Sequence, residues 1–204
     1  MKNNLLIILT RNPELGKCKT RLAAKVGDES ALEIYKFLLE HTVSVTKDLN
    51  TTKWVFYSEK VEDNDMWDPT VYEKRVQVGQ DLGERMMNAF KNGLDAGFAK
   101  IVIIGSDMYD LRQQDIEEAF ESLAHHDFVV GPAVDGGYYL LGMKSLKPEL
   151  FMNKSWGGDR VLSNTLKDMN GHMVHLLSEK NDVDFYEDIK DIEAFQPFLK
   201  HIKE

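Results

Sequence analysis

The stretch from Ile101 to Asp110 reads Ile-Val-Ile-Ile-Gly-Ser-Asp-Met-Tyr-Asp, and the rest of the sequence is best understood from it. Four consecutive apolar residues, most of them β-branched, predict a strand that is buried on both faces of a parallel sheet. The run stops at Gly105 and brings Asp107 to the carboxyl end of the strand, where open α/β sheets bind ligands. Asp107 has two interpretations, as part of a ligand site or as the cap of the next element.

The composition is that of one globular domain. The chain has 204 residues, of which 43% are hydrophobic and 29% are charged. This length suits one domain with a substantial core, so residues 1–204 are predicted to form a single domain. No apolar run approaches the roughly 18–20 residues that span a bilayer, so no membrane span is expected. The single cysteine, Cys18, excludes an intrachain disulfide and predicts a cytoplasmic protein.

The charge balance narrows the class of partner. The formal net charge of −9 argues against nucleic acid, because proteins that bind its backbone carry a basic stripe. Four basic residues nevertheless lie close together near the N-terminus, namely Arg11, Lys17, Lys19 and Arg21. A local cluster of this kind can hold a phosphate in an acidic protein. A small anionic ligand is therefore compatible with the composition, whereas the oligomeric state is left open.

Hydrophobic periodicity predicts alternating strands and helices. The predicted strands lie at residues 5–10, 54–57, 76–78, 101–105, 128–130, 138–141 and 173–177. The predicted helices lie at residues 20–25, 29–49, 81–97, 113–123 and 157–169, and the tail from residue 185 is expected to be helical. This alternation predicts an α/β fold with a largely parallel, doubly wound sheet.

A basic loop follows the first predicted strand. Residues 11–22 read Arg-Asn-Pro-Glu-Leu-Gly-Lys-Cys-Lys-Thr-Arg-Leu. Its cations, its glycine at Gly16 and the start of a helix together favour an anion site. The loop is not a Walker A motif, because Arg11 and Cys18 stand where that motif has Gly and Ser or Thr. The alternative is a solvated basic loop.

A second polar loop covers residues 77–86, Gln-Val-Gly-Gln-Asp-Leu-Gly-Glu-Arg-Met. Asp81 and Glu84 have the spacing of a capping box, and this role is enough to explain both. Gln77 and Gly83 suggest in addition that the loop approaches a ligand closely with amide donors.

Two acidic segments follow later in the chain. Asp135 lies between Gly-Pro and Gly-Gly pairs in residues 131–139, which favours a ligand loop over a tight surface turn. Asp182 and Asp184 alternate with an apolar residue, so in an extended segment both carboxylates point the same way, as hard-cation ligation requires. Mg²⁺ or Mn²⁺ would explain why several carboxylates accompany a basic phosphate loop.

Taken in order, these motifs resemble the DUF2064 family of bacterial proteins assigned as glycosyltransferases. The resemblance rests on Lys-x-Lys-Thr-Arg-Leu, Gln-x-Gly-x-Asp-Leu-Gly-x-Arg-Met, Ile-Gly-Ser-Asp, Gly-Pro-Ala-x-Asp-Gly-Gly-Tyr-Tyr-Leu, Trp-Gly-Gly-Asp and Asp-Val-Asp, from residue 5 to about residue 190. It implies a three-layer α/β/α Rossmann-like sheet, the GT-A or nucleotide-diphospho-sugar transferase fold. The family usually has proline where Tyr109 stands and lysine where Arg11 stands.

The resemblance also implies roles for residues at matching positions. It implies phosphate contacts for Arg11, Lys19 and Arg21, and metal ligation for Asp107 with Asp184 or Asp182. The remaining residues predicted for the nucleotide are Gly16, Gln77 and Gly83. Asp135 is the candidate catalytic base, and the predicted substrate or acceptor loop comprises Gly136, Gly137, Tyr138 and Trp156.

Three functions are compatible with these residues. The first is a metal-dependent glycosyltransferase that moves a sugar from a nucleotide diphosphate to an acceptor that the sequence does not identify. The second is a nucleotidyltransferase on the same fold, which takes an NTP and releases pyrophosphate. The third is a nucleotide-binding module without catalysis. The first two differ in the fate of the β-phosphate, which an assay of released nucleoside diphosphate or pyrophosphate distinguishes.

Overall fold

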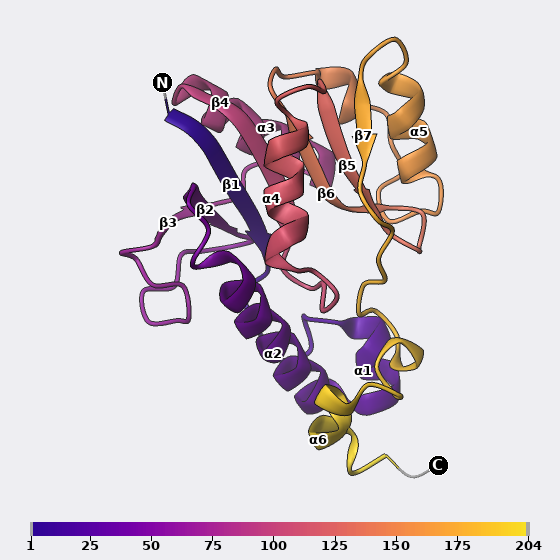
Figure 1. Cartoon of the computed structure of the whole chain (residues 1–204). Helices are drawn as coiled ribbons and strands as arrows, with labels where there is room; N and C mark the ends of the chain where they lie inside the picture. Colours follow the sequence, from indigo (N-terminus) through magenta and orange to yellow (C-terminus); the bar gives the residue numbers. More distant parts are fainter. Residues whose placement is uncertain (1, 203–204) are drawn as a thin grey trace.

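The computed structural model describes residues 2–202, and it contains one sheet of seven strands (Figure 1). The strands are β1 (Lys2–Thr10), β2 (Thr52–Tyr57), β3 (Tyr72–Val76), β4 (Phe98–Gly105), β5 (Phe128–Pro132), β6 (Tyr138–Met143) and β7 (Val174–Leu176). Their order across the sheet is β3-β2-β1-β4-β6-β5-β7. The interior strand β1 contains the apolar run from Leu5 to Leu9, where the sequence predicted a strand.

The sheet is mostly parallel, as predicted. Strands β1, β2, β3 and β4 all run in the same direction, and β7 is parallel to β5. Only β6 is reversed, and it pairs antiparallel with both β4 and β5. The carboxyl ends of β1 and β4 therefore lie side by side, with Leu9 opposite Gly105 in the register. The loops that follow these two strands carry the predicted basic residues and Asp107.

Helices cover both faces of the sheet. They are α1 (Thr20–Val26), α2 (Asp28–Thr46), α3 (Leu82–Asp95), α4 (Gln113–Ser122), α5 (Val161–Asp168) and α6 (Gln196–Leu199). Side chains alternate along β1, so Leu6 and Ile8 pack towards α2 and α4, whereas Leu5 and Ile7 pack towards α3. This produces the three-layer α/β/α arrangement.

A third apolar cluster joins the C-terminal segment to the first two helices. Leu22 of α1 and Leu38 of α2 pack with Val183, Ile189 and Phe195 of the tail. Figure 1 shows α6 lying beside α1 and α2, at the end of the molecule away from β7. The segment that carries Asp182 and Asp184 is thereby held close to the basic loop after β1.

Several predicted boundaries differ from the structure. The strand predicted at 76–78 lies at Tyr72–Val76, because pairing with β2 ends where Val76 meets Tyr57. The helix predicted from residue 157 begins at Val161, since Gly157 has a φ of 83° that a right-handed helix excludes.

The tail predicted to be helical forms only the 3₁₀ turns Tyr186–Asp188 and Glu193–Phe195 and the short α6, and Ile192 is extended between the two 3₁₀ turns. In contrast, the predicted cap of α3 is confirmed, because the Asp81 side chain accepts a hydrogen bond from the Glu84 backbone N–H at 2.9 Å. Within residues 2–202, no helix is both long and apolar enough to cross a membrane.

Candidate functional site

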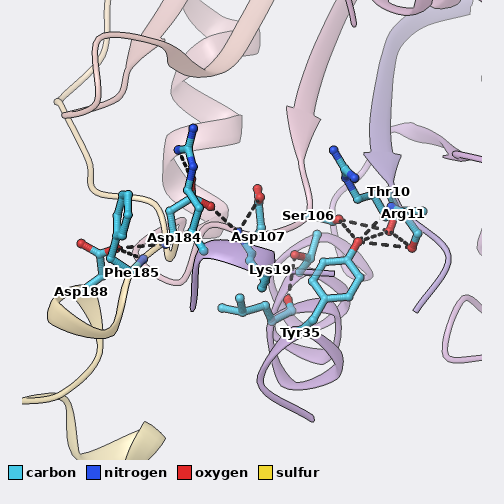
Figure 2. Close-up of polar contacts among 12 residues, drawn as sticks. Thr10, Arg11, Lys19, Tyr35, Ser106, Asp107, Asp184, Phe185 and Asp188 are labelled. Atoms are coloured by element: carbon cyan, nitrogen blue, oxygen red, sulfur yellow. Dashed lines mark hydrogen bonds and ion pairs between the residues drawn. The ribbon is translucent and has the colours of Figure 1, made fainter. Parts of the chain in front are cut away.

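The candidate site lies where the loops after β1 and β4 meet the C-terminal segment (Figure 2). Lys19 Nζ donates to Asp107 Oδ2 at 2.8 Å and to Asp184 Oδ1 at 3.3 Å. Arg21 contacts the other oxygen of Asp184, with 3.0 Å between Nη1 and Oδ2. Four charged residues from three distant segments of the sequence therefore form one continuous array of alternating sign.

Burial differs sharply within this array. The Lys19 side chain is only 5% exposed, whereas the side chains of Asp107 and Asp184 are 43% and 30% exposed. Burial opposes the charge on Lys19, but the two carboxylates outweigh it and raise the lysine pKa. Burial likewise opposes ionisation of Asp107, and Lys19 outweighs it and lowers the pKa of that carboxyl group. Both groups are consequently charged at neutral pH.

The backbone at Lys19 is unusual. Its φ of 49° and ψ of 47° lie in the left-handed region, where residues other than glycine are uncommon. Lys19 is the N-cap of α1, and its side chain makes no capping hydrogen bond. Strained backbone of this kind is concentrated at functional sites. Here the conformation accompanies a lysine that reaches Asp107 and Asp184 rather than solvent.

Tyr35 supports the start of the basic loop, although no sequence pattern predicted a functional role for it. Its hydroxyl, in α2, accepts from the Arg11 backbone N–H at 2.9 Å and lies 3.2 Å from the Arg11 carbonyl oxygen. The same hydroxyl is within hydrogen-bond distance of the Thr10 and Ser106 hydroxyls, at 3.2 and 3.3 Å. These residues join the ends of β1 and β4 beside the charged array (Figure 2).

Arg11, predicted to contact phosphate, is exposed at the end of this network. Its positive charge contributes to lowering the pKa of Asp107, so it belongs to the electrostatic surroundings of the array. Gly16, also predicted for the nucleotide, has a φ of 74° and forms part of the turn in which the Lys17 N–H donates to the Glu14 carbonyl oxygen.

Gln77 joins the ends of three strands. Its side-chain Nε2 donates to the backbone carbonyl oxygens of Thr10 at 2.8 Å and Phe56 at 2.9 Å. Its Oε1 lies 3.4 Å from Arg85 Nη1. Both amide hydrogens of Gln77 are thus used within the protein, so this side chain supports the floor of the site in the observed arrangement.

Gly83 is a position of close packing. A Cβ atom at residue 83 would lie 2.4 Å from the Phe151 carbonyl oxygen and 2.6 Å from Trp156 Nε1. Glycine is therefore required where α3 meets the loop that carries Trp156. The sequence placed Gly83 with the nucleotide and Trp156 with the acceptor, and the structure brings these two residues into contact.

Asp135 lies in a loop that packs against the Trp-Gly-Gly-Asp segment. Its Oδ1 accepts from the Gly137 backbone N–H at 2.8 Å, which orients an otherwise exposed carboxylate. Gly136 has a φ of 87°, and a Cβ atom there would lie 2.1 Å from the Asp159 carbonyl oxygen. Tyr138 turns inward, with its hydroxyl directed at Met86 Sδ at 3.9 Å, and burial raises its pKa.

The pKa of Asp182 depends on acidic residues from its own segment and from two others. Burial, followed by the charges of Asp184, Asp135 and Asp107, raises the pKa of Asp182 to about 6. Acidic residues of the array and of the Asp135 loop thus both oppose ionisation of Asp182. Asp182 stays a prediction as a metal ligand, whereas Asp184 shares the Lys19 ammonium group with Asp107 in the structure.

The array has oxygen ligands of the type that Mg²⁺ and Mn²⁺ prefer, but Lys19 already bridges them. Among residues 2–202, no three histidine, cysteine, aspartate or glutamate side chains converge closely enough to hold a metal ion. Asp107 and Asp184 are thus suited in chemistry to a divalent cation, provided that the Lys19 ammonium group leaves its place between them.

Comparison with solved structures identifies the fold. A protein from Desulfovibrio desulfuricans G20, described as a "putative nucleotide-diphospho-sugar transferase", is 29% identical with a TM-score of 0.85, and 98% of this chain and 95% of that chain are covered. A 4-diphosphocytidyl-2C-methyl-D-erythritol synthase from Anaerococcus prevotii is 10% identical with a TM-score of 0.59, and 96% of each chain is covered.

A third structure is that of Rv0371c from Mycobacterium tuberculosis H37Rv in complex with manganese. It is 13% identical with a TM-score of 0.54, and 98% of this chain and 99% of that chain are covered. At this level of identity the likeness concerns the fold alone. Among curated proteins, none matches this sequence.

The seven-stranded α/β/α architecture and its likeness to the Desulfovibrio structure define a protein of the nucleotide-diphospho-sugar transferase fold. Within that class the family can be stated as well. The family described as "Uncharacterized protein conserved in bacteria (DUF2064)" matches residues 42–158, more than half of the chain. The chain belongs to the DUF2064 family, as its motifs predicted.

Proposed function

We propose that this protein is a transferase that uses a nucleotide-diphosphate sugar and moves the sugar to an acceptor. The observation that carries the proposal is the array of Lys19, Asp107, Asp184 and Arg21 at the carboxyl ends of β1 and β4. That edge is the one at which open α/β sheets bind ligands. The similarity to the Desulfovibrio protein, whose name states the same class of donor, supports it.

The basic residues are assigned to the diphosphate of the donor. Lys19 and Arg21 belong to the array, and Arg11 is exposed beside it, so that all three cations are available to phosphate oxygens. Charge-assisted hydrogen bonds of this kind are about twice as strong as neutral ones. Asp107 and Asp184 are the residues that would hold Mg²⁺ or Mn²⁺, which stabilises the negative charge of a diphosphate leaving group.

Asp135 is assigned as the base that takes the proton from the acceptor. Its Oδ1 is held by the Gly137 N–H, while Oδ2 has no such bond among the described residues, and Asp135 as a whole is exposed. Proton removal by a positioned carboxylate contributes about 10²–10⁴ in rate. Gly136, Gly137 and Trp156 are proposed to shape the acceptor side, with Tyr138 packing beneath them.

Nucleotidyl transfer is the second candidate. The 4-diphosphocytidyl-2C-methyl-D-erythritol synthase named above has the same fold, and a basic loop after β1 suits an NTP as well as a nucleotide sugar. In that reaction the bond broken lies between the α- and β-phosphates, and pyrophosphate leaves. We further propose that residues 1–204 act as one domain, since all seven strands join one sheet.

One experiment separates these functions. The purified protein is incubated with UDP- and GDP-sugars, and separately with NTPs, in the presence of Mn²⁺, and both nucleoside diphosphate and pyrophosphate are measured. Release of nucleoside diphosphate supports sugar transfer or slow donor hydrolysis, and pyrophosphate release supports nucleotidyl transfer. Binding without either product identifies a non-catalytic module.

A matched pair of variants links any activity to the array. Asp107→Asn removes the charge that faces Lys19, and it should abolish product release with little change in melting temperature. Asp110→Asn makes the same change three residues later, at an exposed side chain, and should leave the rate unchanged. Equal losses in both variants would contradict the placement of the donor at the array.

A further inference from the structure

We propose that Lys19 is a built-in counter-ion that competes with a divalent cation for Asp107 and Asp184. The free protein should therefore bind Mn²⁺ or Mg²⁺ weakly at these carboxylates, and removal of the lysine charge should create a better metal site. This inference deepens the proposed function, on which its biological meaning rests, because it concerns how the same site controls its metal requirement.

The first argument is occupancy of the carboxylate oxygens. Lys19 contacts Asp107 Oδ2 and Asp184 Oδ1, and Arg21 contacts Asp184 Oδ2. Three of the four oxygens of this carboxylate pair thus already face a cation. The fourth, Asp107 Oδ1, is directed towards Gly105, where a Cβ atom would lie 3.0 Å from it. A metal ion consequently has no free pair of oxygens to bridge while both basic side chains stay in place.

The second argument is distance. Mg²⁺ binds carboxylate oxygen at about 2.0–2.1 Å. An ion at Asp107 Oδ2 would lie at most about 5 Å from Lys19 Nζ, because that nitrogen is 2.8 Å from the same oxygen. The two charges of the ion and the one charge of Lys19 would then be confined next to two carboxylates, in a place where the Lys19 side chain is almost fully shielded from water. Ammonium and metal are therefore alternatives at this position.

The third argument is that the fold itself buries the Lys19 side chain between the carboxylates. Its side chain is 5% exposed, and its backbone lies in the left-handed region at the start of α1. The carboxylates themselves remain partly open to solvent, so access does not prevent metal binding. A diphosphate offers oxygen acceptors to Lys19 and would draw the ammonium group away from the carboxylates. Phosphate and metal would then favour each other's binding, as linkage requires.

The test is a titration with Mn²⁺ alone, in which the electron paramagnetic resonance signal of free Mn²⁺ reports binding. Lys19→Met should bind Mn²⁺ at least about tenfold more tightly than the wild type, because it removes a competing charge a few ångströms from the ion. The matched control is Lys17→Met, in the same loop. Lys17 is exposed and pairs with Glu14 and Glu59 instead, so this variant should bind Mn²⁺ as the wild type does.

Two further variants make the result decisive. Lys19→Gln keeps a hydrogen-bond donor for the carboxylates, and it replaces the methionine variant if the latter does not fold. It should show the same gain. Adding Asp107→Asn to either variant should abolish the gain, which locates the ion at this pair. Mn²⁺ affinity in Lys19→Met and Lys19→Gln that is no higher than in the wild type would overturn the competition.

This titration contains no nucleotide, so it is independent of the proposed reaction. A gain in Mn²⁺ affinity together with no product from any nucleotide sugar or NTP would leave the competition standing and remove the proposed transferase activity. The reverse outcome, with sugar transfer in the wild type and no gain in the variants, would keep the proposed function and remove the competition.

Discussion

Replacing Tyr35 with phenylalanine removes one oxygen atom from the buried polar network beside the charged array. The Arg11 backbone N–H then loses the acceptor that lies 2.9 Å from it. The Thr10 and Ser106 hydroxyls retain each other at 3.1 Å, so most of the loss falls on the Arg11 peptide group. Tyr35 is 3% exposed, and water does not readily replace the missing hydroxyl.

The expected cost follows from that lost acceptor. A buried N–H that loses its partner costs about 1–3 kcal/mol, and removal of the oxygen leaves almost no new cavity. We therefore expect Tyr35→Phe to lower the free energy of unfolding by about 2 kcal/mol. For a protein of this size, 1 kcal/mol shifts the melting temperature by roughly 2–4 °C, so the melting temperature should fall by about 4–8 °C.

Urea unfolding and amide hydrogen exchange at Arg11 measure this effect, with Tyr186→Phe as the matched control. The Tyr186 ring lies under the Lys25 ammonium group, and among the described residues its hydroxyl takes part in no hydrogen bond. The control should change stability by no more than about 0.5 kcal/mol. If Tyr35→Phe is as stable as the control and exchange at Arg11 is unchanged, the network does not hold the basic loop.

Three further variants test other parts of the site. Asp182→Asn removes a carboxyl group whose pKa of about 6 in the folded protein exceeds the ordinary 3.8. Because the folded state disfavours the charged form of this group, urea unfolding should find the variant about 1 kcal/mol more stable than the wild type at pH 8. This difference in stability should disappear as the pH falls from 6 to 4. Gly83→Ala should cost about 1–3 kcal/mol in calorimetry because its methyl group meets Trp156, and an unchanged melting temperature would contradict the close packing. Tyr109→Ala should destabilise the protein by about 2 kcal/mol, since the Tyr109 ring packs edge-on against Phe195 with 4.9 Å between ring centroids. The variant should also lose its C-terminal segment to protease faster than the wild type does. An unchanged rate of cleavage would contradict this packing role.

The convergence of charges from distant segments was predictable because parallel strands impose it. Two apolar runs, residues 5–9 and 101–104, each end in a polar loop, and the topology brings their carboxyl ends to one edge of the sheet. The meeting of Lys19 with Asp107 follows from that rule. Asp184 is different, because no strand delivers it, and only its alternation with Asp182 and the family resemblance pointed to the site.

The roles of individual side chains were less predictable. Tyr35 has the spacing of a core residue on an amphipathic helix, and nothing in the sequence reveals that its hydroxyl reaches a loop 24 residues earlier. Gln77 has donors suited to phosphate, but whether they face a ligand or neighbouring carbonyl oxygens depends on the end of β3. Local patterns predict which residues come to an edge, whereas hydrogen-bond partners depend on packing at a scale of about one ångström.

The separation of Asp107 and Asp184 is set by apolar packing as much as by charge. Tyr109, two residues after Asp107, packs against Phe195 and against Phe37 of α2. Val183, next to Asp184, is buried in the same cluster of tail and helix side chains. Each carboxylate is therefore adjacent to a residue anchored in one common apolar cluster, which holds the two segments together in addition to the cation between them. A pair fixed in this way can exchange an ammonium group for a metal ion without collapse or separation, which is the property that competition between Lys19 and a divalent cation requires.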